Sequence, residues 1–115
     1  MATFECEIQR DANNKVTVTH KPNNPGFKAF KKNEDRIRFK SSDPGMVIRY
    51  VKTSPFTDSE LGVGTELPIG TIKGPFQCTI VGVHHFECGR IENGKFIPWP
   101  EGGGDTPVED FNVRG

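Results

Sequence analysis

The stretch that decides the fold of this chain is VGVHHFECGRIENGKF, residues 81–96. Its apolar and polar side chains alternate, as they do along a β-strand that has one buried face. On such a strand His84, Phe86 and Cys88 share the inward face, whereas His85 points to the opposite side. The stretch therefore predicts a strand whose inward face carries an imidazole and a thiol, and it raises the question of a metal site.

The second half of this stretch predicts a tight hairpin. Asn93-Gly94 suits a type I′ turn, because that turn requires positive φ at both of its central residues. The turn places Glu92 opposite Lys95 and Ile91 opposite Phe96, so that one ion pair and one apolar pair face each other across the strands.

Period-two alternation also recurs outside this stretch. TFECEIQ (residues 3–9), KVTVTH (15–20) and DRIRFKS (35–41) alternate, and MVIRYVK (46–52) is apolar enough for a central strand. No segment keeps the spacing of an amphipathic helix over three turns. About seven short strands with turns between them predict one all-β domain over residues 1–115, an antiparallel Greek-key β-sandwich.

Three other segments carry weaker signals. Residues 21–35 are rich in Pro, Asn and Gly and are predicted to form a loop with little regular structure. Residues 53–70 are predicted to be irregular, with a short helical turn near DSEL (58–61) as the one candidate helix. FNV (111–113) is predicted to be a last, edge strand.

Composition and charge exclude several classes of protein. The 115 residues include nine Phe, which can fill one core, and the formal net charge is zero. Residues 1–52 contain 11 Lys and Arg against 6 Asp and Glu, whereas residues 53–115 contain 4 against 9. The two halves cancel, so the net charge of the chain does not favour nucleic-acid binding. No apolar run is long enough to cross a membrane, and no signal peptide is present. We expect a cytosolic protein, or a mature domain given a new start codon.

The three cysteines, Cys6, Cys78 and Cys88, leave two redox states open: one disulfide with a thiol, or three thiols. We favour three buried thiols over a Cys78–Cys88 bridge, because nothing else indicates an oxidising compartment. No CxxC motif is present, which excludes a zinc ribbon or a thioredoxin-type site.

Two segments resemble cupredoxins. EDRIRFKSSDPGMVIRYV (residues 34–51) is similar to a strand of the form Asp-x-φ-x-Phe that leads through a loop into a second apolar strand. HFECG, within residues 76–90, is similar to the family's aromatic-x-Cys strand end, where the cysteine is the copper thiolate. The resemblance implies a cupredoxin-like sandwich. An immunoglobulin-like sandwich is the alternative, although Trp99 follows every cysteine and the Cys-Trp-Cys order of antibody domains is missing.

The copper ligands that the resemblance implies are not matched. Such sites need two imidazoles, a thiolate and usually a weak axial thioether. Met46 stands where the first histidine is expected, and the Asn-Gly hairpin occupies the place of the ligand loop after Cys88. His84 and Cys88 are about 13 Å apart along a strand, whereas two ligands of one ion lie within about 4 Å of each other. No cofactor is therefore expected.

Two candidate sites remain. Trp99, together with Phe96 and Asp105, is predicted to contact a ligand, such as a sugar ring or a proline-rich segment. The competing interpretation is that Trp99 packs as a lid over one end of the core.

The alternative site is a copper or zinc centre. It would be formed by Cys88 with His84 or His85, or with His20 brought in from elsewhere in the chain.

These observations rank three functional classes. The first is a non-enzymatic binding or interaction module without a copper site, whose contacts to a protein or small ligand come from loops 52–70 and 97–107. The second is the copper or zinc protein. An enzyme ranks third, because no paired carboxylates, phosphate loop or nucleophile with a base is present.

The basic series Arg36, Arg38 and Lys40 is interpreted as a solvated sheet face. No nucleic-acid or membrane partner is expected, and the oligomeric state is left open.

Overall fold

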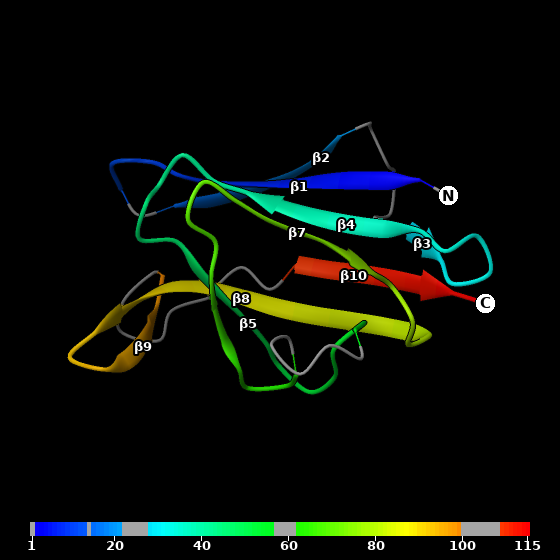
Figure 1. Ribbon diagram of the computed structural model, residues 1–115. Coiled ribbons are helices and arrows are strands. Elements are labelled where there is room, and N and C mark those ends of the chain that lie inside the picture. Colours follow the sequence, from blue (N-terminus) through cyan, green and yellow to red (C-terminus); the bar gives the residue numbers. More distant parts are fainter. Residues whose placement is uncertain (1, 14, 22–27, 57–61, 100–108) are drawn as a thin grey trace.

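The computed structural model describes residues 2–13, 15–21, 28–56, 62–99 and 109–115, with residues 109–111 described by their backbone alone (Figure 1). This part of the chain forms strands and turns and contains no helix. Its strands are β1 (Thr3–Arg10), β2 (Val16–Lys21), β3 (Lys28–Phe30), β4 (Arg36–Lys40), β5 (Val47–Tyr50), β6 (Glu66–Pro68), β7 (Ile72–Gln77), β8 (Gly82–Glu92), β9 (Lys95–Pro98) and β10 (Glu109–Arg114).

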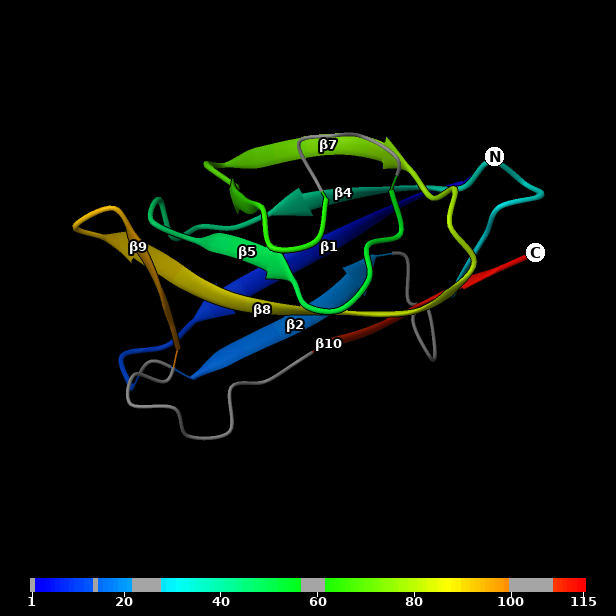
Figure 2. The ribbon, with the colours of Figure 1, turned by 90° about the horizontal axis from the view of Figure 1, so that it is seen from below.

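The strands form two sheets that pack face to face, as Figures 1 and 2 show. One sheet has four strands in the order β2-β1-β4-β7. The other has six, in the order β3-β10-β8-β5-β6, with β9 paired to β8. The all-β sandwich predicted from the sequence is confirmed.

The prediction that the sandwich is antiparallel is wrong, because each sheet contains one parallel pair. β1 runs parallel to β4, with Phe4 opposite Ile37, and β10 runs parallel to β3, with Val113 opposite Ala29. Parallel neighbours need a crossover connection. The chain provides it by crossing to the other sheet at β3 before it returns to β4. Alternation is the same in parallel and antiparallel strands, so the sequence pattern could not distinguish them.

Three strand assignments also differ from the sequence predictions. β3 lies inside the segment expected to be a loop, and β6 lies inside the segment expected to be irregular. β10 includes the predicted FNV strand, but it lies between β3 and β8 and is not an edge. A strand of three residues gives too short an alternation to recognise. The helical turn proposed near DSEL lies outside the described residues.

The core lies between the sheets and is built on aromatic rings. Phe39 from the four-stranded sheet meets Phe86 from the six-stranded sheet edge to face, with ring centroids 6.1 Å apart. Tyr50 meets Phe86 at 5.6 Å, and Phe56 meets Phe39 at 6.3 Å. Edge-to-face pairs at these distances add to the free energy gained by burying the rings. The aromatic rings thus join the two sheets.

The hairpin predicted at Asn93-Gly94 is confirmed. Asn93 and Gly94 have φ values of 52° and 76°, as a type I′ turn requires. Ile91 pairs with Phe96, and Glu92 pairs with Lys95.

The inward face of β8 is also as predicted. His84, Phe86 and Cys88 are each about 1% exposed and point between the sheets. β5 is an interior strand, because it pairs with both β6 and β8.

Candidate functional site

Loops gather at the two ends of the sandwich (Figure 1). At one end, which we call the β9 end, lie residues 11–13 after β1, the β4–β5 connection at 41–46 and the β8–β9 hairpin. At the other, the β3 end, lie both chain termini, β3 and the turn at residues 31–34.

Trp99 closes the β9 end. Its side chain is only 2% exposed, and its backbone N–H donates to the Cys88 carbonyl at 3.0 Å. The Arg10 guanidinium carbon lies 4.2 Å from the centroid of the indole ring, and that of Arg90 lies 5.5 Å away. Both are within the range of cation–π attraction. Trp99 therefore packs as a lid over this end, and little of its ring is left to contact a ligand.

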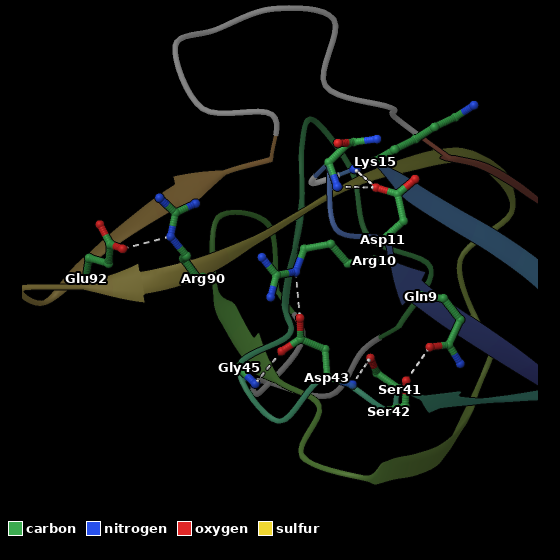
Figure 3. Close-up of polar contacts among 11 residues, drawn as sticks. Gln9, Arg10, Asp11, Lys15, Ser41, Ser42, Asp43, Gly45, Arg90 and Glu92 are labelled. Atoms are coloured by element: carbon green, nitrogen blue, oxygen red, sulfur yellow. Dashed lines mark hydrogen bonds and ion pairs between the residues drawn. The ribbon is translucent and has the colours of Figure 1, made fainter.

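Carboxylates hold the arginines of this end in place (Figure 3). Arg10 donates from Nε to Asp43 at 2.7 Å, and Arg90 donates from Nε to Glu92 at 2.8 Å. The Gly45 N–H donates to the other Asp43 oxygen at 2.9 Å, which fixes the β4–β5 connection. The Arg10–Asp43 contact ties the end of β1 to the connection that follows β4. No sequence signal predicts it, because the two residues are 33 positions apart.

Phe96 lies on the other face of the hairpin. It lies three positions before Trp99, an odd spacing that places the two side chains on opposite faces of an extended segment. The Phe96 ring covers Gly89, where a Cβ would lie 2.8 Å from its Cζ atom, and the Arg49 guanidinium stacks 4.3 Å from the ring centroid. The structure thus separates the predicted contact residues Trp99 and Phe96. The third, Asp105, lies outside the described residues.

His84 is fully committed to hydrogen bonds at the β3 end. Its Nε2 lies 2.7 Å from the Ile80 carbonyl, and its Nδ1 lies 2.8 Å from the Thr53 hydroxyl. A carbonyl only accepts, so Nε2 carries the proton and Nδ1 accepts from Thr53. Neither ring nitrogen has a lone pair left for a metal ion. His85 points to the opposite face of β8, so it cannot join His84 and Cys88 at one ion.

None of the three cysteines forms a disulfide, and all three are buried. Burial, with a smaller contribution from Asp35, raises the pKa of Cys78 to about 12. All three thiols lie near the buried phenol of Tyr50, whose pKa is raised well above its ordinary value mainly by burial. The Cys78 thiol therefore stays protonated at neutral pH and is a poor nucleophile.

The described residues contain no group of three or more His, Cys, Asp or Glu side chains arranged to hold a metal ion. The residues of the predicted copper or zinc site, Cys88 and the two neighbouring histidines, accordingly do not form such a group.

The sequence predictions assigned no role to Asp35 and considered His20 only as a possible metal ligand, although both are buried. Asp35 accepts the Ala2 N–H at 3.0 Å and the Phe30 N–H at 2.9 Å, so its carboxylate joins the first strand of one sheet to β3 of the other. Its position directly before an apolar strand was the available signal. His20 lies opposite Cys6 on the inward side of β2, and burial lowers its pKa to about 4.

No protein-family model matches this chain, and no curated protein matches its sequence. In the described residues, no helix is long and apolar enough to cross a membrane.

Proposed function

We propose that this chain is a non-enzymatic binding module built on a cupredoxin-like, Greek-key sandwich that has no copper site. The observation that carries the proposal is the closed β9 end, where the buried Trp99 ring lies against the Arg10 guanidinium and the Trp99 N–H binds the Cys88 carbonyl. A fold supports many functions, so the argument depends on this end of the molecule and not on the sandwich alone.

The two segments that resemble cupredoxins are neighbours in both sheets, which supports the proposed scaffold. In the six-stranded sheet, Ile48 of β5 pairs with Cys88 of β8 and Tyr50 pairs with Phe86. In the four-stranded sheet, β4 pairs with β7, with Ile37 opposite Phe76. The strand pair that carries the thiolate in the family therefore has a counterpart here.

The positions where the family carries its ligands favour the absence of copper. The β4–β5 connection offers Asp43, which binds Arg10, and Met46, which is completely buried. The segment after Cys88 offers Arg90 and Trp99, neither of which is a copper ligand.

Binding is the remaining role for which the end loops are suited. Loops carry contact residues on a rigid scaffold, and the loop predicted for this role includes Val63, which is 53% exposed beside the β5–β6 strands. An exposed valine in a connection next to paired strands is available to a partner without rearrangement of the core.

The proposed absence of a copper site is tested by adding Cu(II) to the pure, reduced protein and recording visible absorption. We expect no thiolate-to-copper band and no stoichiometric metal by elemental analysis. A strong band that is lost in Cys88→Ala would show that the protein is a copper protein and would overturn the proposal.

The binding half is tested with two matched variants. Val63→Glu introduces a charge in the predicted contact loop, whereas Ile91→Glu introduces the same charge at another exposed apolar position, on the hairpin. A partner of the wild-type protein should be lost from Val63→Glu and retained by Ile91→Glu. Retention by both variants would exclude the loop as the contact.

A further inference from the structure

The charged side chains on the outer faces of the two sheets differ in how far they are paired. On the four-stranded sheet, Glu5 lies 2.8 Å from Arg38 and 3.8 Å from Lys40, and Glu7 lies 3.0 Å from Lys21. Two of the three cations in the basic series of β4 are therefore paired, as expected for a solvated face. On the six-stranded sheet, β3 and the beginning of β8 present exposed apolar side chains beside Arg114 of β10 and the lysines of the turn at residues 31–34.

The strand register places these side chains on one face. Arg114 of β10 pairs with Phe30 of β3, and Asn112 pairs with Val83 of β8. Residues that pair across a sheet share a face, and alternate residues of one strand do so too. Val113, between Asn112 and Arg114, is buried against the core. Phe30, Val83 and Arg114 therefore all point outward, away from the second sheet.

The apolar side chains of this face are exposed. Phe30, Val81 and Val83 expose 38%, 53% and 49% of their surface. The Lys31 N–H donates to the Arg114 carbonyl at 2.8 Å, which holds the end of β3 against the end of β10. We call the surface formed by Phe30, Lys31, Val81, Val83 and Arg114 the β3–β8 patch. It lies at the end of the molecule that carries both chain termini (Figure 1).

Exposed cations flank this apolar surface. Lys31, Lys32 and Arg114 are exposed, and none of them makes an ion pair within the part of the chain that the structure describes. Glu34 is the one exposed carboxylate of the turn at residues 31–34. The turn and the end of β10 thus form a basic rim.

We infer that the β3–β8 patch is a docking surface for an acidic segment of another protein that carries aliphatic or aromatic side chains beside its carboxylates. An apolar centre with a charged rim is the usual anatomy of a protein interface, and a basic rim selects a partner of opposite charge. The surface is separate from the loop around Val63, so the inference goes beyond the proposed function and stands without it.

The shape of the patch favours a protein over an anionic membrane. Phe30 and Val83 lie on strands that both pair with β10, on one face of the sheet. An amphipathic helix that buries one apolar side among the lipids, a common device for membrane contact, is not present in the described residues. A sheet face with a few apolar side chains suits a second protein surface or an extended segment laid across it.

Fluorescence anisotropy with labelled peptides tests the inference. The probe is a short peptide in which Glu alternates with Leu, and its control carries Lys in place of every Glu. We expect the acidic peptide to bind, more weakly as salt is added, and the basic peptide not to bind. Val83→Glu should weaken binding about tenfold, because it places a carboxylate at the centre of the contact.

Two further variants at exposed positions test binding without depending on whether Val83→Glu folds. Arg114→Glu reverses a charge of the rim on an exposed position, and Lys15→Glu makes the same reversal at the β9 end. We expect Arg114→Glu to weaken binding and Lys15→Glu to leave it unchanged. Equal affinity of all variants for the acidic peptide, or failure of that peptide to bind, would overturn the inference. Binding to phosphatidylserine vesicles without binding to the peptide would overturn it in favour of a membrane surface.

Discussion

The two ends of this sandwich are closed by different chemistry. The β9 end is covered by one large ring, Trp99, with guanidinium groups against it that are themselves paired to carboxylates. The β3 end is held by buried polar groups, the carboxylate of Asp35 and the imidazole of His84. The ring that closes the β9 end contributes mainly by packing, whereas the polar groups at the β3 end contribute through hydrogen bonds that substitution leaves unsatisfied. The two ends are therefore sensitive to different kinds of substitution.

The largest expected effect is at the β9 end. Trp99→Ala should destabilise the protein by about 3–5 kcal/mol, because it removes a buried ring and leaves a cavity beside Cys88. Chemical denaturation with a circular dichroism readout measures the loss. Trp99→Phe is the matched control and should cost less, since it keeps an aromatic face for Arg10. A loss below about 1 kcal/mol for Trp99→Ala would show that Trp99 is not a lid.

Asp35→Ala is the corresponding destabilising substitution at the β3 end. It removes the acceptor of two part-buried N–H groups, those of Ala2 and Phe30, and should cost about 3 kcal/mol. Asp35→Asn keeps one acceptor oxygen and should cost less than Asp35→Ala. Equal and small losses in both variants would mean that the carboxylate does not join the sheets.

The pH dependence of stability reports on the buried imidazole of His20 in β2 and not on the lid at the β9 end. The folded-state pKa of His20 is about 4, below the ordinary 6.5, because burial disfavours the charged ring. The unfolded chain thus binds a proton between pH 6.5 and 4 that the folded chain does not bind, so stability is complete above pH 6.5 and falls as the pH decreases through that window. After allowance for solvent screening, the loss is about 2 kcal/mol.

The comparison of wild type with His20→Gln measures this contribution, because carboxylates elsewhere titrate equally in both proteins. The variant should have a flatter stability profile between pH 6.5 and 4, by urea denaturation at each pH. Parallel profiles for the two proteins would rule out a buried neutral His20.

A smaller effect is expected at the hairpin that leads to the lid. Gly94 has a φ of 76° with open space around it, so a side chain there is strained by the backbone alone. Gly94→Val should cost about 1–2 kcal/mol, measured as a lower melting temperature. An unchanged melting temperature would count against the turn.

The smallest effect concerns Cys88, which lies beneath Trp99. Cys88→Ala should cost about 1 kcal/mol, as expected for the loss of a small buried group. In the wild-type protein, Cys88 should react slowly with a thiol reagent when folded and quickly when denatured. Fast reaction of the folded protein would contradict the closed β9 end.

Several features of this protein were determined by local sequence. The inward face of β8, the strand β4 and the Asn93-Gly94 turn each depend on a few consecutive residues, because alternation and turn chemistry are local properties. The all-β class follows from the same alternation. These predictions needed no knowledge of which strands are neighbours.

Only the tertiary structure decided which strands are neighbours and which of the candidate site residues come together. Alternation is the same for either strand direction, so the two parallel pairs and the interior position of β10 depend on how the chain crosses between sheets. The pairing of Arg10 with Trp99 and Asp43 joins segments far apart in the chain, and no local pattern encodes such a contact. His84 was open to interpretation as a metal ligand until Thr53 and Ile80 were seen to bind both of its nitrogens. Residue type specifies what a side chain is able to do, but the partners that long-range packing brings to it decide what it does.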